Sequence, residues 1–153
     1  SNSLLEGLVF SRRIAEVLPA ELRPWSDPVE DDRPTGLVDP DSRRILQETM
    51  TERVGVLRSH DGLKIALEEL TELAQTCMTV PSPPAWEATN LVTISTALTQ
   101  AALGREETRG SHWREDHPER DDEGWAGHFD AVLADGGVQE RFAPAAPTDR
   151  FES

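Results

Sequence analysis

The sequence predicts an all-α fold, an antiparallel bundle of three to four helices with a C-terminal loop and a segment that can close into a short β-hairpin. Three observations predict it. Apolar residues recur with helical spacing in long segments, clusters of proline separate these segments, and the helical periodicity stops after residue 110. We therefore divide the chain into a first helix (1–18), a proline-rich crossover loop (19–40), a helical bundle (41–110) and a charged loop, hairpin and tail (111–153).

The first helix is predicted over 3–18. Its apolar stripe follows the i, i+4, i+7 pattern at Leu4, Leu8, Ser11, Ala15 and Leu18. Ser3 and Glu6 have the spacing of a capping box, in which a hydroxyl and a carboxylate bond to the first free amides. Pro19 is expected to end this helix, because proline lacks the amide that a helix interior needs.

A second helix is predicted to start after the crossover loop, with Asp39 as its N-cap and Pro40 as its first residue. Gly55 is expected inside it, and 59–62 is a short interruption or kink. The expected apolar face comprises Ile45, Leu46, Thr49, Met50, Val54 and Leu57.

The clearest helical stripe in the chain comes next and comprises Leu63, Ala66, Leu67, Leu70, Leu73, Ala74 and Cys77. Cys77 is therefore expected to be a buried, inert thiol. Three prolines at 81–84 break the stripe, and a last long helix is predicted over 86–107, with Gly110 as its stop. Its expected face comprises Leu91, Ile94, Ser95, Leu98, Ala101 and Ala102.

The segment after Gly110 has a different character. Residues 111–127 are polar and aperiodic, which predicts a loop. Two short runs, 129–133 and 138–142, flank Ala134-Asp135-Gly136-Gly137, and an Asp-Gly pair between such runs indicates a hairpin.

Composition excludes several classes of protein. The formal net charge is −14, with 29 acidic and 15 basic residues among 153, and this field would repel a nucleic acid backbone. The sequence contains no run of about 18 apolar residues, so no membrane-spanning helix is predicted. Its first residues also lack the basic region that begins a signal peptide. The lone cysteine excludes an internal disulfide, so we expect a cytoplasmic protein. The absence of an initiator methionine is consistent with a piece of a longer chain.

No catalytic set and no metal site are predicted. The four histidines do not fall at i, i+4 on any expected helix. The densest chemistry lies in 106–122, where Arg109, His112, Trp113 and Arg114 mix with carboxylates at the end of a helix. From the residues alone, this segment is either a hydrogen-bonded loop that caps the bundle or part of a binding site.

Three segments, in order, resemble one flavoprotein family. The opening Ser1–Phe10 is similar to a segment of the L-aspartate oxidases, which belong with the flavoprotein subunits of succinate dehydrogenase and fumarate reductase. Residues 50–63 resemble the second bundle helix of that family. Residues 107–116 resemble its signature Glu-Ser-Arg-Gly-Ala-His-aromatic-Arg-x-Asp, from which Thr108 and Ser111 depart mildly. The Leu-Glu-Gly-Leu-Val-Phe run is the aspartate oxidase version of the opening.

The resemblance implies a C-terminal piece of an FAD-dependent enzyme that oxidises L-aspartate to iminoaspartate in de novo NAD biosynthesis, with oxygen or fumarate as electron acceptor. It implies that the backbone amides of Ser3 and Leu4 meet the pyrimidine edge of the flavin. A helix N-terminus suits that role, because its free amides carry about half a positive charge. The implied partner is the FAD-binding domain of the same parent chain, and the piece alone is expected to be inactive.

Two alternatives remain open at this point. After L-aspartate oxidase, to which the match is closer, the chain is a candidate for the C-terminal domain of a succinate dehydrogenase or fumarate reductase flavoprotein subunit, or for a stand-alone helical interaction module without a redox role. If the chain is a piece of a longer flavoprotein, a helix face left without its neighbouring domain predicts self-association.

Overall fold

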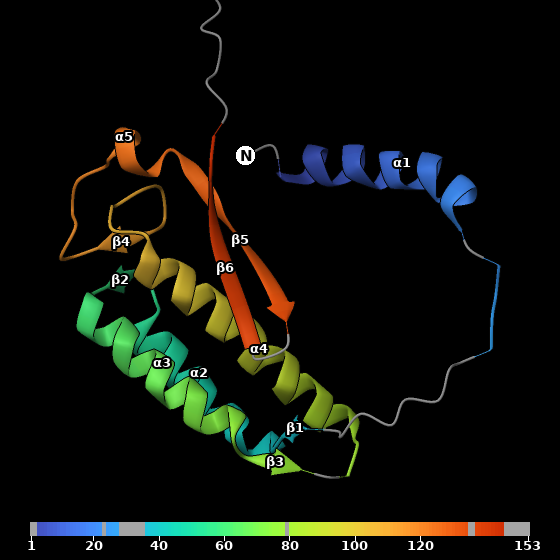
Figure 1. Cartoon of the computed structure of the whole chain (residues 1–153), viewed down its shortest axis with the longest axis horizontal. Coiled ribbons are helices and arrows are strands. Elements are labelled where there is room, and N and C mark those ends of the chain that lie inside the picture. Colours follow the sequence, from blue (N-terminus) through green and yellow to red (C-terminus); the bar gives the residue numbers. More distant parts are fainter. Residues whose placement is uncertain (1–2, 23, 28–35, 79, 135–136, 146–153) are drawn as a thin grey trace, which may run out of the picture. The chain divides into compact units, whose positions relative to one another are not determined.

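The computed structural model describes residues 3–22, 24–27, 36–78, 80–134 and 137–145. Two units are distinguished, Ser1–Arg33 and Pro34–Ser153. The first contains the helix α1 (Ser3–Glu21), and the second contains every other helix and strand (Figure 1). None of the helices described is long and apolar enough to cross a membrane.

Helix α1 continues past the proline that was expected to end it. Pro19 lies inside the last turn, and the Leu22 amide still donates to the Leu18 carbonyl at 2.8 Å. The expectation was wrong because a proline so near the end removes one hydrogen bond without preventing the next ones from forming. The expected capping box at Ser3 involves a side chain outside the described part of the chain.

The second unit is built around three helices, α2 (Arg43–Arg53), α3 (His60–Ala74) and α4 (Pro83–Gly104), which lie side by side in Figure 1. This arrangement confirms the all-α fold class. Two adjacent clusters of buried apolar side chains form the core: Val38, Leu46, Leu70, Leu73, Ala88 and Val92 in one, and Val54, Leu63, Ala66 and Ala102 in the other. A 3₁₀ turn, η1 (Pro40–Ser42), precedes α2, and Asp39 caps it as expected.

Helix α2 is shorter than predicted. It ends at Arg53, so Gly55 lies outside it, and the chain then forms β2 (Leu57–Arg58). Strand β2 pairs in parallel with β4 (Trp113–Arg114), far along the sequence. The prediction that Leu57 belongs to a buried helix face was wrong, because the pairing turns this side chain outward and leaves it 61% exposed. Ile45 is also exposed.

Helix α4 begins earlier and ends earlier than predicted. Pro83 occupies its first turn after the N-cap Ser82, so this proline starts the helix as well as ending the segment before it. The buried face consists of Ala85, Ala88, Val92, Ser95, Thr99 and Ala102. Ile94 and Leu98, which were expected to be buried, are exposed, because the small residues form the face that packs closely against α3.

The stop expected at Gly110 lies in the loop beyond α4, where this glycine adopts a positive φ of 59°. Cys77 is also placed differently from the prediction. It lies in β3 (Cys77–Met78), which pairs with β1 (Leu37–Val38), and its side chain is exposed.

The expected hairpin is present, with strands β5 (Gly127–Ala134) and β6 (Gly137–Pro144) longer than predicted. It contacts α4 through β6, as Figure 1 shows. A short helix, α5 (Asp122–Trp125), precedes it, and Trp125 packs with Phe129 and Phe142 at centroid distances of 6.1 and 5.4 Å. The predicted turn residues 135–136 lie outside the described residues.

Candidate functional site

The two residues expected to meet a flavin lie at the start of α1. Ser3 is the first residue of the helix, and Leu4 follows it with 86% of its surface exposed. The first amides of any helix have no acceptor within it and carry its positive partial charge. This helix start therefore fits an electron-rich ring edge that accepts hydrogen bonds from backbone amides.

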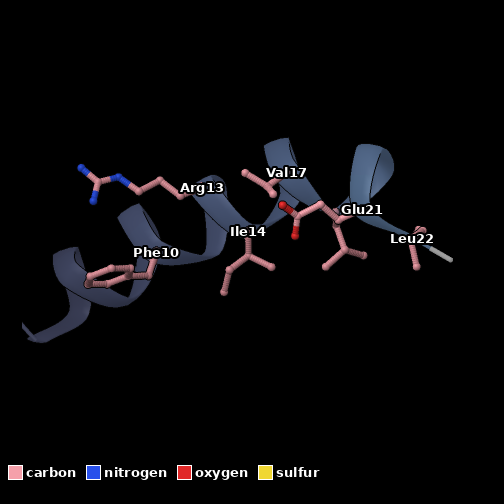
Figure 2. A pocket seen from close by; sticks show the side chains of 7 residues that line it. Phe10, Arg13, Ile14, Val17, Glu21 and Leu22 are labelled. Carbon is pink, nitrogen blue, oxygen red and sulfur yellow. The ribbon is translucent and has the colours of Figure 1, made fainter.

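The rest of α1 presents apolar side chains to solvent. Phe10, Ile14, Val17, Leu18 and Leu22 line a shallow hollow along the helix, bordered by Arg13 and Glu21. Figure 2 shows Phe10 and Ile14 projecting from the same side of the helix. An exposed apolar face along a helix is typical of a surface that another polypeptide covers.

The signature segment, residues 107–116, closes the C-terminal end of α4. Arg114 is fully buried, and its Nη1 donates to the carbonyls of Ala102, Leu103 and Arg105 at 2.9 to 3.0 Å. Its Nε and Nη2 bond to both carboxylate oxygens of Asp116 at 2.9 and 2.7 Å. One guanidinium thus satisfies the carbonyls that the helix end leaves without partners.

Glu107 is the second fully buried charge of this segment. It accepts hydrogen bonds from Arg105 at 2.6 Å, from Arg109 at 2.7 Å and from the Asp121 amide at 2.9 Å. Burial by itself raises the pKa of Glu107, but these three donors outweigh it and lower that pKa to about 2. Glu107 is therefore an anion at neutral pH and holds Arg105 and Arg109 together.

His112 lies between two elements of the unit. Its Nδ1 is 2.7 Å from Arg58 Nη1, and its Nε2 is 3.2 Å from the Arg105 carbonyl. Burial is the largest cause that lowers the pKa of His112, and the nearby arginines lower it further. The ring is thus neutral at pH 7, with Nδ1 accepting from Arg58 and Nε2 donating to Arg105.

These contacts show what the densest segment of the sequence does. Arg109, His112 and Arg114 all bond to residues of the second unit, so each contributes to the loop that caps the bundle. Sequence reasoning missed Arg58 as a member of this network. Its position in a family-like segment was the one available signal, because no spacing rule links residue 58 to residue 112.

Known proteins resemble the chain over most of its length. The family model described as "Fumarate reductase flavoprotein C-term" matches residues 43–145. L-aspartate oxidases from Streptomyces coelicolor and Rhodospirillum rubrum are 40% and 39% identical over 148 and 126 residues, which cover 84% and 79% of this chain. The succinate dehydrogenase flavoprotein subunit of Coxiella burnetii is 32% identical over an alignment of 155 positions, gaps included, that covers 84% of this chain.

Among solved structures, the Mycobacterium smegmatis Sdh1 complex in the apo form aligns with a TM-score of 0.57 at 25% identity, over 91% of this chain and 24% of that chain. The chain spans only part of its curated relatives: 26% of the Streptomyces and Coxiella proteins and 43% of the Rhodospirillum protein.

Proposed function

This chain belongs to the fumarate reductase flavoprotein C-terminal family, and on that premise we propose that it is the C-terminal helical domain of an FAD-dependent L-aspartate oxidase. Two aspartate oxidases with about 40% identity support this assignment over the family's other enzymes. The parent enzyme would oxidise L-aspartate to iminoaspartate for NAD biosynthesis in the cytoplasm, with oxygen or fumarate as acceptor.

The observation that carries the domain's role is the exposure of α1. Nine apolar side chains of residues 4–22 are between 47% and 86% exposed: Leu4, Leu5, Leu8, Val9, Phe10, Ile14, Val17, Leu18 and Leu22. A helix of this kind gains little stability alone, because helices in proteins depend on burying an apolar face. In our proposal, α1 packs onto the FAD-binding domain of the parent chain.

That docking would set Ser3 and Leu4 beside the flavin. Bound flavin supplies the two-electron oxidation, and the amides of the first turn of α1 would hold its pyrimidine edge. The positive end of the helix favours negative charge at that edge, which helps the ring to accept electrons.

The first test compares the isolated chain with the full-length protein. The chain alone should show no flavin absorbance in the visible spectrum and no aspartate-dependent peroxide. The full-length protein should bind FAD and oxidise L-aspartate. Turnover, or stoichiometric flavin, in the isolated chain would contradict the proposal.

A second test isolates the amide of Leu4. In the full-length protein, Leu4→Pro removes this donor at a place where a helix tolerates proline. We expect FAD affinity to fall by about tenfold, the value of one hydrogen bond to a charged group. Leu4→Ala keeps the amide and should retain affinity. Equal affinities in the two variants would exclude this contact.

A second candidate is the C-terminal domain of a succinate dehydrogenase or fumarate reductase flavoprotein subunit. The 32% identity to the Coxiella subunit favours it over other enzyme classes. Succinate oxidation by the full-length protein, without activity on L-aspartate, would replace the first candidate by this one.

A further inference from the structure

Arg58 differs from the other buried and half-buried arginines of the described residues. Arg53, Arg105, Arg109 and Arg114 each have a carboxylate oxygen within 3.2 Å. Arg58 bonds only to neutral groups. Its Nε donates to the Val54 and Gly55 carbonyls at 3.2 and 2.9 Å, and its Nη1 donates to His112.

These contacts leave donors without acceptors. A guanidinium has five N–H groups, and the three bonds use only the Nε hydrogen and one Nη1 hydrogen. Both Nη2 hydrogens and the second Nη1 hydrogen have no partner among the described residues. Burial without a counter-ion lowers the pKa of Arg58, which is the expected sign of a cation that an anion would stabilise.

The guanidinium borders a pocket of about 280 Å³ between α4, the signature loop and the hairpin. Leu98, Ala101 and Phe129 give this pocket an apolar wall. His112 is fixed by bonds at both ring nitrogens, and the guanidinium of Arg105 is already bonded to Glu107. Arg58 therefore has donors to spare for a ligand, and His128, whose Nε2 lies 3.3 Å from Asp130, lines the same pocket.

The shape and lining select the ligand's chemistry. Adjacent Nη1 and Nη2 hydrogens of a guanidinium form a planar fork that matches the two oxygens of a carboxylate. A phosphate also accepts such a fork, but it would place its remaining oxygens against the apolar wall. A hydrocarbon chain attached to a carboxylate would instead bury carbon against Leu98 and Phe129.

We propose that the pocket beside Arg58 binds the carboxylate group of an organic acid, with the acid's hydrocarbon part on the wall formed by Leu98, Ala101 and Phe129. None of the residues that line this pocket belongs to the helix start assigned to the flavin, and its first test does not depend on the proposed function.

Butyrate is the probe for that test. The chain is titrated with butyrate at constant ionic strength, and the NMR signals of the His112 ring and the Arg58 side chain are followed. We expect saturable shifts with a Kd of about 10 mM or below, and at least about tenfold weaker binding of inorganic phosphate. Absence of saturation up to about 100 mM would overturn the proposal.

Two matched variants on α4 avoid disturbing Arg58 itself. Leu98→Glu places a carboxylate in the pocket and should abolish butyrate binding. Ile94→Glu makes the same change at an exposed position one turn away and should leave binding unchanged.

A third variant changes Arg58 itself: Arg58→Lys keeps the charge without the planar fork and should weaken butyrate binding about tenfold. Equal binding by the two glutamate variants would refute the site.

The carboxylate has two sources, a free acid or an acidic side chain of the parent polypeptide. Butyrate binding by both the chain and the full-length protein indicates the free acid. Binding by the chain alone indicates that a side chain of the parent polypeptide fills the pocket, and only this interpretation rests on the proposed function. If neither the chain nor the full-length protein binds butyrate, the site is overturned and the flavin assignment still stands.

Discussion

At the scale of single residues, stability depends on two buried charges, Arg114 and Glu107, that no apolar pattern could reveal. Both lie in the signature segment and both are fully buried with complete sets of partners. Removing one partner of such a pair leaves the others buried and unsatisfied, which costs more than the pair itself contributes.

We predict that Arg114→Ala destabilises the second unit by about 3 to 5 kcal/mol. The change leaves three carbonyls at the end of α4 and the carboxylate of Asp116 without their donor. Urea denaturation followed by circular dichroism measures this loss. Arg141→Ala, at an exposed position of β6, is the control and should stay within about 0.5 kcal/mol of the parent.

The loss of folding stability at acid pH should report the protonation of Glu107. Its folded pKa of about 2 lies below the usual value, so its contribution is complete at neutral pH and is lost as the pH falls from about 5 to about 2. We expect Glu107→Gln to be less stable at pH 7 by up to about 3 kcal/mol, with a flatter stability curve below pH 5. Stability measured at half-unit steps tests this, and parallel curves would contradict it.

His112 affects the folding stability at higher pH than Glu107 does. Because its folded pKa is lowered, the unfolded chain binds the proton first, and stability falls as the pH drops below about 6.5. The losses of stability caused by protonation of His112 and of Glu107 therefore fall in different pH ranges and can be separated in one series of unfolding measurements.

At the scale of elements, the Arg105 side chain joins the hairpin to the end of α4, and Gly127 lets the two strands of the hairpin meet closely at their base. Arg105 donates to the Trp125 and Gly127 carbonyls at 2.9 and 2.8 Å, and its guanidinium lies 5.7 Å from the centre of the Phe129 ring. A Cβ at Gly127 would overlap the Ala143 carbonyl oxygen and lie 2.7 Å from the Phe142 ring.

We therefore expect Gly127→Ala to force β5 and β6 apart at their base, at a cost of about 1 to 3 kcal/mol. Hydrogen exchange should accelerate in the hairpin and stay unchanged in α2 and α3. Gly36→Ala is the matched control, because a Cβ there meets no atom within 4 Å. A hairpin equally protected in both variants would show that the base of the hairpin tolerates the methyl group.

Elements with a strong local signal could be predicted from the sequence. The stripe of α3 and the Asp-Gly hairpin are read from neighbouring residues, and both are present. The end of α2 and the exposure of Leu57 could not be predicted, because they depend on the pairing of β2 with β4 across more than fifty residues. The exposed side of α4 was misjudged because its close packing uses alanine, serine and threonine, which apolar periodicity undervalues.

The same distinction applies to the candidate site. The composition of segment 106–122 indicated its importance, and the cap on α4 was one of its two predicted roles. Arg58 and the pocket could not be found, since the guanidinium is identified by what it lacks rather than by a motif. The role of Ser3 and Leu4 stays a prediction.

At the scale of the whole molecule, strong negative charge is combined with an uncovered apolar helix. The net charge of −14 opposes association, and the face of α1 favours it. Because charge repulsion is screened by salt and apolar attraction is not, the balance between them depends on ionic strength.

We predict that the isolated chain self-associates through α1, more strongly at high salt. Ile14→Glu should reduce this association by about tenfold or more, because it places a charge in the middle of the apolar face. Sedimentation velocity over a concentration series measures it. Arg12→Gln lowers the net charge by the same amount at an exposed, polar position of α1, and should leave association unchanged.

The exposure of Cys77 has a practical consequence for studying this protein. It is the single cysteine of the sequence and lies at the surface on β3. A maleimide dye or nitroxide can therefore be attached to the second unit at one defined atom without mutating other thiols. A second label at position 12 of α1, attached by chemistry that does not use thiols, would let energy transfer measure the separation of the two units with and without the rest of the parent chain.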